Sequence, residues 1–290
     1  MIEALFHYQF LQNALISGIL ASVVCGIIGV IIVEKKLVMM SGGIAHTSYG
    51  GVGLGYLLGF EPIIGAFIFS LSAALGIGYI KRKGAARTDV VIGLFWSLGM
   101  AAGILFIAIM PGYPPDLGSY LFGSILSVTK ADLTLTAVLT FIVIAVIVAL
   151  YNDWKAYLFD QEFASIIGVR TALLEYLLLI LIAMAVVVLI RVVGIILVLA
   201  LLTAPAAIAD MLTADLKRRM VYAILFGIVF CISGLWISYA MDIASGATIV
   251  ILAVMCYLLI YVARLVYLRV NKKNCRVSNK PKMIRGVENE

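Results

Sequence analysis

Long apolar runs that contain no charged residue constrain this chain more than any other feature. A membrane-spanning helix needs about 20 apolar residues to cross roughly 30 Å of hydrocarbon, and several runs of that length follow one another here. The strands of a membrane β-barrel would instead alternate apolar and polar residues. Only 12% of the 290 residues are charged, against about a quarter in a soluble domain. We therefore predict an all-α, polytopic membrane protein.

The apolar runs divide into nine predicted transmembrane helices. They cover residues 13–33, 37–59, 62–80, 90–110, 133–151, 171–190, 192–210, 221–240 and 247–268. The division at Arg191 is a tight turn, so the count becomes eight if residues 171–210 do not form two spans. We expect residues 1–268 to form one transmembrane domain. Residues 269–290 are expected to form a basic, disordered cytoplasmic tail.

The basic residues predict how the chain is oriented in the membrane. One set of loops contains Lys35, Lys36, Lys81, Arg82, Lys83, Arg87, Lys155, Arg170, Lys217, Arg218 and Arg219, and the segment from Arg264 onward adds eight more. The opposite set contains only Lys130 and Arg191. Because cytoplasmic loops carry the excess of Lys and Arg, we expect the N-terminus outside and the C-terminus in the cytoplasm of a multi-pass protein of the cell membrane. The net charge of +6 thus reflects orientation and does not indicate nucleic-acid binding.

Two connections are too long to be simple turns. The outer one, residues 111–133, begins with a proline-rich stretch that ends the preceding helix. The inner one, residues 151–170, contains Phe159, Phe163 and Ile166 at helical spacing. Asp160 is placed to cap the start of a short helix there, and Gly168 to end it. This amphipathic helix either rests on the membrane surface or docks a cytoplasmic partner.

The second predicted span is rich in glycine and contains one of the two histidines. Small residues recur every fourth position in a stripe that lets another helix approach closely: Gly43, Thr47, Gly51, Gly55 and Gly59. His46 lies ten residues beyond Lys36, which is about 15 Å along a helix and near the middle of a bilayer. Imidazole is a good ligand for transition metals. His46 is therefore either an ion ligand or a hydrogen-bonding residue of the helix packing.

Several motifs that would indicate other functions are missing from the sequence. There is no G-x-x-x-x-G-K-[ST] phosphate loop, no H-E-x-x-H zinc motif and no pair of catalytic groups. We therefore expect neither an enzyme nor a bound cofactor. Uphill transport by this chain would need energy from another subunit or from an ion gradient.

Four stretches resemble the membrane permeases of ATP-binding cassette importers for zinc, manganese or iron(II). They are LVMMSGGIAHTSYGGVGLGYLLG (37–59), DLGSYLFGSIL (116–126), FDQEFASIIGV (159–169) and RVVGIILVLALLTAPAAIA (191–209). The first resembles the family pattern L-V-x-M-G-D-x-x-S-H-x-x-x-x-G-V. The four stretches occur in the family's order, and the resemblance extends over about residues 12 to 266.

The resemblance implies partners and roles for particular residues. Such permeases work as pairs with two ATPase subunits, which bind the ATP, and an extracytoplasmic solute-binding protein delivers the ion. The implied contact with the ATPase comprises Phe159, Asp160, Glu162, Phe163, Ala164 and Gly168. The outer segment 111–132, with Asp116 and Asp132, is the implied docking site for the solute-binding protein. His46 matches the pathway histidine of the family, but Gly42 stands where the family has an aspartate.

Two other functions compete with import of a metal ion. In the first, the same machinery moves another solute, such as a metal chelate, which predicts a wider pathway that does not depend on His46. A stand-alone carrier or channel driven by a gradient would instead need no partner ATPase.

Overall fold

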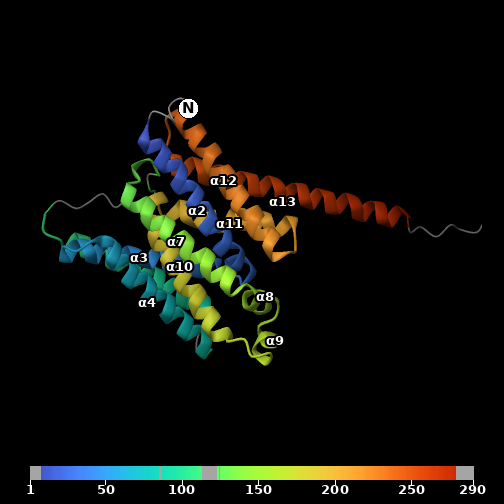
Figure 1. The fold of residues 1–290 in the computed structure, drawn as a ribbon, viewed down its shortest axis with the longest axis horizontal. Coiled ribbons are helices and arrows are strands. Elements are labelled where there is room, and N and C mark those ends of the chain that lie inside the picture. The colour runs from blue at the N-terminus through green and yellow to red at the C-terminus, as the bar shows by residue number, and fades with distance from the viewer. Residues whose placement is uncertain (1–7, 85–86, 113–122, 124, 279–290) are drawn as a thin grey trace, which may run out of the picture.

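The computed structural model describes residues 8–84, 87–112, 123 and 125–278, with side chains as far as Tyr267. This part of the chain contains helices and no strand. The helices are α2 (Gln9–Glu34), α3 (Val38–Leu58), α4 (Pro62–Lys83), α5 (Thr88–Ala108), η1 (Ile125–Ser127), α7 (Lys130–Ala149), α8 (Tyr151–Phe159), α9 (Gln161–Ile166), α10 (Thr171–Val193), α11 (Ile195–Leu212), α12 (Leu216–Met241) and α13 (Ser245–Ser278). Figure 1 shows them as a bundle from which α13 projects.

Eight of the described helices are long and apolar enough to cross a membrane: α2, α4, α5, α7, α10, α11, α12 and α13. The all-α, polytopic fold class is thus confirmed. Helices α10 and α11 are separate, divided at Gly194, which has a φ of 81°. The uncertainty in the count therefore does not arise at residues 171–210. It arises at α3, which has 21 residues but is not among the eight helices.

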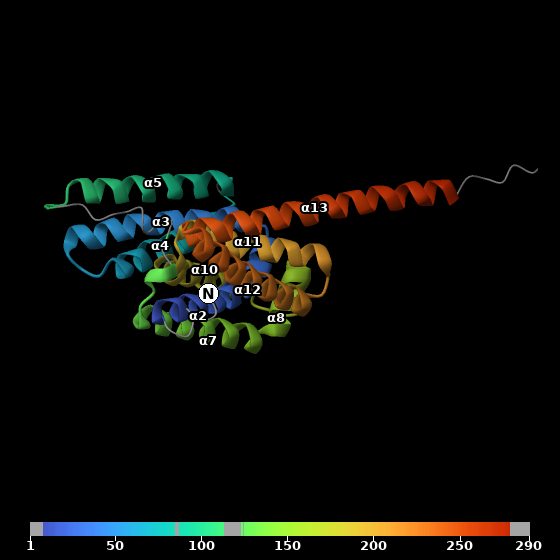
Figure 2. The same cartoon turned by 90° about the horizontal axis from the view of Figure 1, so that it is seen from above.

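Helix α3 packs between α4 and α5 (Figure 2). Its glycines let the backbones touch, since a Cβ added to Gly51 would overlap the carbonyl oxygen of Gly65 on α4. On the side of α5, a Cβ on Gly53 would lie 2.6 Å from the carbonyl oxygen of Gly103. Close approach of this kind is how small residues stabilise helix pairs in a membrane, where apolar burial gives little driving force. A helix of modest hydropathy is thus enclosed by its neighbours.

Four of the five residues in the predicted small-residue stripe lie against a neighbouring helix. A Cβ on Gly43 would lie 2.6 Å from the Ile92 side chain, and one on Gly55 would lie 2.7 Å from the Cα of Pro62. The Thr47 hydroxyl donates hydrogen bonds to the carbonyl oxygens of Gly43, at 2.7 Å, and of Phe95, at 3.0 Å. Gly59 is a correction, because its φ of 73° ends α3 and a Cβ there would contact nothing within 4 Å. Gly59 therefore terminates the helix and does not pack.

The apolar core lies along α2, α10 and α11, where Ile28, Val186 and Leu201 are fully buried. The outer faces of α5, α7 and α13 leave large apolar side chains exposed. This arrangement suits a lipid environment, in which apolar side chains can face the hydrocarbon.

The basic loops gather at one end of the bundle, through ion pairs that join elements far apart in sequence. Lys81 and Arg82, at the end of α4, lie 2.8 and 3.8 Å from the Glu175 carboxylate in the first turns of α10. Arg219, near the start of α12, pairs with Glu34 at the end of α2 and lies 3.0 Å from Asp210 on α11. We refer to this end as the basic end of the bundle.

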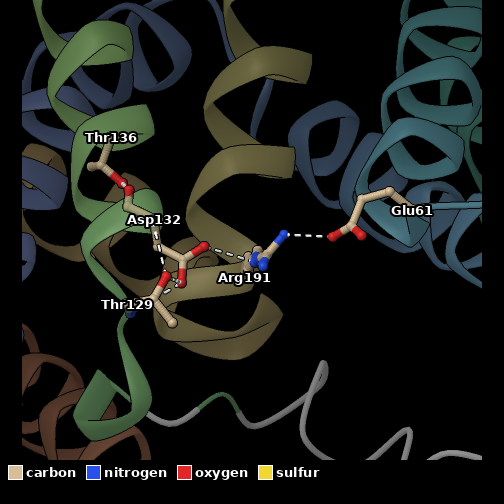
Figure 3. A network of polar contacts seen from close by, with 5 residues as sticks. All are labelled: Glu61, Thr129, Asp132, Thr136 and Arg191. Atoms are coloured by element: carbon tan, nitrogen blue, oxygen red, sulfur yellow. Dashed lines mark hydrogen bonds and ion pairs between the residues drawn. The ribbon is translucent and has the colours of Figure 1, made fainter.

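A network centred on Arg191 lies at the opposite end (Figure 3). The Arg191 guanidinium lies 2.7 Å from Asp132 at the start of α7 and 2.9 Å from Glu61, which precedes α4. Asp132 also forms a capping box with Thr129, because its carboxylate accepts from the Thr129 backbone N–H at 3.1 Å and its own backbone N–H donates to the Thr129 hydroxyl oxygen at 3.2 Å. The side chain of Asp132 is only 8% exposed, whereas that of Glu61 is 56% exposed. The network ties α7, α10 and the α3–α4 turn together.

The last helix is longer than its predicted span. We expected residues 247–268 to be helical, and α13 extends from Ser245 to Ser278. It therefore continues ten residues past the predicted domain boundary at 268. Residues 279–290 of the predicted tail lie outside the described residues.

The glycine contacts lead to a prediction about stability. We expect Gly51→Ala to lower the free energy of unfolding by roughly 1–3 kcal/mol, because overpacking a tight contact typically has that cost. Gly93→Ala on α5 is a matched control, since its Cβ would meet nothing within 4 Å. Thermal unfolding of the purified proteins in detergent measures the difference. Equal melting temperatures for the two variants would contradict the close α3–α4 contact.

The Arg191 network predicts unequal effects for its two carboxylates. Asp132→Asn should cost roughly 1–3 kcal/mol, because it removes a buried charged partner and an acceptor of the capping box. Glu61→Gln should cost about 0–1 kcal/mol, as is usual for an exposed ion pair. Denaturant or thermal unfolding in detergent compares the two. Equal decreases in the free energy of unfolding for the two variants would show that burial does not distinguish the two ion pairs.

Candidate functional site

His46 lies in the middle of α3, and its imidazole stacks on the indole of Trp96 from α5. The two ring centroids are 4.1 Å apart and the ring planes differ by 9°. The stack is supported by the neighbouring residues, because the Thr47 hydroxyl donates to the carbonyl oxygen of Phe95. Residues 46–47 and 95–96 are thus aligned across the α3–α5 contact.

The His46 Nδ1 atom is buried and has no hydrogen-bond partner among the described residues. Buried polar atoms are nearly always paired, so an unpaired one calls for an explanation. This observation disfavours the alternative in which His46 serves packing through a hydrogen bond to a neighbouring helix. In the neutral imidazole one ring nitrogen carries a lone pair, which can bind a metal ion.

Gly42 lies one turn before His46 and also faces Trp96. A Cβ added to Gly42 would lie 3.5 Å from Cζ3 of the Trp96 ring, which is an ordinary van der Waals distance. The indole therefore covers both positions, and a small side chain at residue 42 would fit. In this chain the place of the family's carboxylate is bordered by an aromatic ring.

No group of three or more His, Cys, Asp or Glu side chains that could hold a metal ion occurs among the described residues. His46 is therefore not part of a closed metal cage within this part of the chain. His46 therefore presents one imidazole beside the indole ring of Trp96.

The short helix of the inner connection begins as the sequence predicted. The Asp160 carboxylate accepts hydrogen bonds from the backbone N–H groups of Glu162, at 2.9 Å, and of Phe163, at 3.0 Å. Helix α9 ends at Ile166, and Gly168 follows with a φ of 90°. The cap at Asp160 and the glycine after the helix are confirmed.

Helix α9 presents apolar side chains outside the bundle. Phe163 is 55% exposed and Ile166 is 81% exposed, whereas Ala164 is fully buried. Phe159, which is 91% exposed, belongs to the preceding helix α8. Figure 1 shows α8 and α9 together at one end of the bundle. Ala164 therefore anchors α9 while its larger apolar residues remain uncovered.

Helix α8 was not predicted from the sequence, and it fixes the position of α9. Its Trp154 and Tyr157 side chains are buried in the core at the basic end. Their spacing of three residues, with Leu158 next to them, is the signal that indicates one buried helical face. The side chains of Leu158 and Phe159 also line a cleft of about 150 Å³ with Glu34 and Arg219.

Of the two aspartates predicted for the outer docking site, only Asp132 lies among the described residues. Asp116 lies outside the described residues, so its role stays a prediction. Asp132 does not suit docking, because its carboxylate is buried in the contacts with Arg191 and Thr129. The sequence places Asp132 at the end of the outer connection, and the ion pair with the distant Arg191 accompanies its burial.

The sequences of several known proteins are similar to this chain over most of its length. An uncharacterized membrane protein of Synechocystis is 44% identical over 259 residues, which is 89% of this chain and 92% of that protein. The manganese transport system membrane protein MntC of Listeria monocytogenes is 36% identical over 90% of this chain and 92% of its own length. A probable iron transport system membrane protein of Haemophilus influenzae is 34% identical over 85% and 90%.

Solved structures show the same fold. The structure of PsaBC from Streptococcus pneumoniae in complex with Fab matches with a TM-score of 0.81 and 33% identity, over 90% of this chain and 94% of that chain. An inward-facing structure of a putative metal-chelate type ABC transporter matches with a TM-score of 0.74 at 14% identity, which shows a shared fold only. Residues 7–264 match the ABC 3 transport family. The chain therefore belongs to the ABC 3 transport family of membrane permeases.

Proposed function

We propose that this chain is the permease subunit of an ATP-binding cassette importer for a divalent transition-metal ion. Support comes from relatives named for manganese and iron transport. Manganese, zinc and iron(II) are the candidate ions, and manganese has the most support among these names. A homodimer of permeases would move the ion by alternating access, with ATP bound only by the partner subunits.

Helix α9 is the observation that carries this proposal. A helix of six residues lies outside the membrane-spanning bundle and leaves Phe163 and Ile166 uncovered. It lies at the basic end, which the positive-inside rule assigns to the cytoplasm. An apolar surface at that position is suited to a groove on a cytoplasmic ATPase. The N-terminus and the outer segment 111–132 would then face outward, where a metal-binding solute-binding protein could dock.

The contact with the ATPase can be tested by one substitution. Burying a large apolar side chain is worth roughly 1.5–3 kcal/mol, so Phe163→Asp should greatly reduce co-purification with the proposed ATPase partner. Leu212→Asp is a matched control, because Leu212 is 53% exposed at the same end but belongs to α11. Normal co-purification and normal ATPase stimulation with Phe163→Asp would exclude α9 as the contact.

The role of His46 can be tested through its aromatic neighbour. We expect His46→Ala to reduce Mn²⁺ uptake by the reconstituted complex about tenfold or more, a loss of at least about 1.4 kcal/mol. Mn²⁺ bound at His46 should also quench the fluorescence of Trp96, which lies 4.1 Å from the imidazole. Titrations of the unmodified protein, His46→Ala and Trp96→Phe measure this effect. Quenching should disappear in both variants.

Gly42→Asp provides a gain-of-function comparison at the same site. The space beside Trp96 accepts a Cβ, and a carboxylate one turn from His46 should tighten Mn²⁺ binding about tenfold. The gain should be lost in the double variant with His46→Ala. Normal uptake and unchanged Mn²⁺ binding in His46→Ala alone would assign this histidine to helix packing.

A further inference from the structure

The turn between α2 and α3 makes a polar contact with α8 that the proposed function does not use. The Lys35 ammonium donates a hydrogen bond to the carbonyl oxygen of Tyr157 at 2.8 Å. The same Nζ lies 3.7 Å from the centroid of the Tyr157 ring. Cation–π contacts gain strength when both groups are partly removed from water. One ammonium therefore holds the end of α8 by two interactions.

The surroundings of Lys35 are charged on several sides. Burial and the neighbouring Lys81 lower the pKa of Lys35, while Glu175, Glu34 and Asp160 oppose that shift. Burial also raises the pKa of Tyr157 to about 12, so its ring remains a neutral partner. These carboxylates partly offset the effect of burial, and the ammonium directly contacts the carbonyl oxygen and the ring of Tyr157.

The Tyr157 end of the Lys35–Tyr157 contact lies next to α9 in the chain. Tyr157 lies in the last turn of α8, and Asp160 serves both as the residue that ends α8 and as the N-cap of α9. Tyr157 is 2% exposed and Ala164 is fully buried, so both ends of this short segment are anchored. A displacement of α9 by a partner would therefore be transmitted to Tyr157.

The Lys35 end of the contact lies next to α3, the helix that carries His46. Only three residues separate α2 from α3. Their backbone is hydrogen-bonded, with the N–H of Leu37 donating to the carbonyl oxygen of Ile32 at 2.8 Å and Lys36 at a φ of 56°. This is the pattern of a Schellman turn, and the side chain of Leu37 is buried. A shift of Lys35 therefore moves the start of α3, from which His46 is about 12 Å away along the helix.

We infer that Lys35 is a positioning residue that links α9 to α3 through the Lys35–Tyr157 contact, so that movement of α9 shifts the helix carrying His46. Helices α7 and α10 flank α8 and α9 in the chain and can follow α9 through the backbone. Helix α3 has no such connection, because Lys35 and Tyr157 are 122 residues apart in sequence. The inference rests on the proposed function, since it assumes that α9 meets the ATPase.

Reconstituted complexes of the permease, its ATPase and its solute-binding protein provide the test. Lys35→Met keeps the apolar part of the side chain but removes the ammonium. Lys36→Met is the matched control, because it removes the same charge from the adjacent, exposed residue. The measured quantity is Mn²⁺ taken up per ATP hydrolysed, in the same proteoliposomes.

We expect the Lys35→Met complex to assemble and hydrolyse ATP, while uptake per ATP falls about fivefold or more, as for a typical coupling energy. Lys35→Arg, which retains charge and donors, should restore part of the ratio, and Lys36→Met should leave it unchanged. A purely structural role would lower uptake and hydrolysis in parallel and leave the ratio intact, which would overturn the inference. If Lys35→Met does not assemble, Lys35→Gln is judged by the same ratio.

The result also separates this inference from the proposed function. If the unmodified complex shows no ATP-dependent uptake of Mn²⁺, Zn²⁺ or Fe²⁺, the proposed function fails and the inference fails with it. If the unmodified complex transports and Phe163→Asp separates it from the ATPase, the function stands. An unchanged ratio in Lys35→Met would then overturn the Lys35 link alone.

Discussion

Backbone contact between α3 and its two neighbours is the constraint on which the candidate site depends. Lipid is as apolar as the side chains, so helices in a bilayer associate through close packing and hydrogen bonds. Glycines of α3 meet Gly65 on α4 and Gly103 on α5 with no room for a Cβ. This contact lets a helix that carries an imidazole and several glycines remain inside the bundle. It also brings Trp96 onto the face of His46.

Ion pairs within the protein involve several charged groups at each end of the bundle. Arg191 joins two carboxylates at one end, and Lys81, Arg82 and Arg219 pair with acidic residues at the other. The exposed apolar surface of α5, α7 and α13 lies along the long helices, where a bilayer can cover it. The apolar residues of α9 differ because they lie beyond the bundle. The proposed ATPase partner would cover them, and such a contact would distinguish a subunit of a larger complex from a stand-alone carrier.

Features set by local sequence could be predicted, and features set by distant contacts could not. The apolar runs predicted the long helices, and Asp160 and Gly168 predicted the limits of α9, because caps act within one turn. The four-residue repeat predicted the packing face of α3 but extended it wrongly to Gly59, where the same residue type ends the helix. The burial of Asp132 by Arg191, the stacking of Trp96 on His46 and the Lys35–Tyr157 contact each join segments far apart in sequence. No periodicity of a single helix contains that information.

If His46 is the ion ligand that we propose, its surroundings suit passage of an ion better than storage of one. A permeating ion must bind well enough to enter and weakly enough to leave. The described residues contain no group of three His, Cys, Asp or Glu side chains that could hold an ion tightly, and a single imidazole nitrogen would satisfy the second requirement. Trp96 restricts access to one face of the ring and contributes no strong ligand atom. Selectivity in such a site would depend less on a rigid coordination cage than on the ion delivered from outside and on the movement of α3, which begins at the turn held by Lys35.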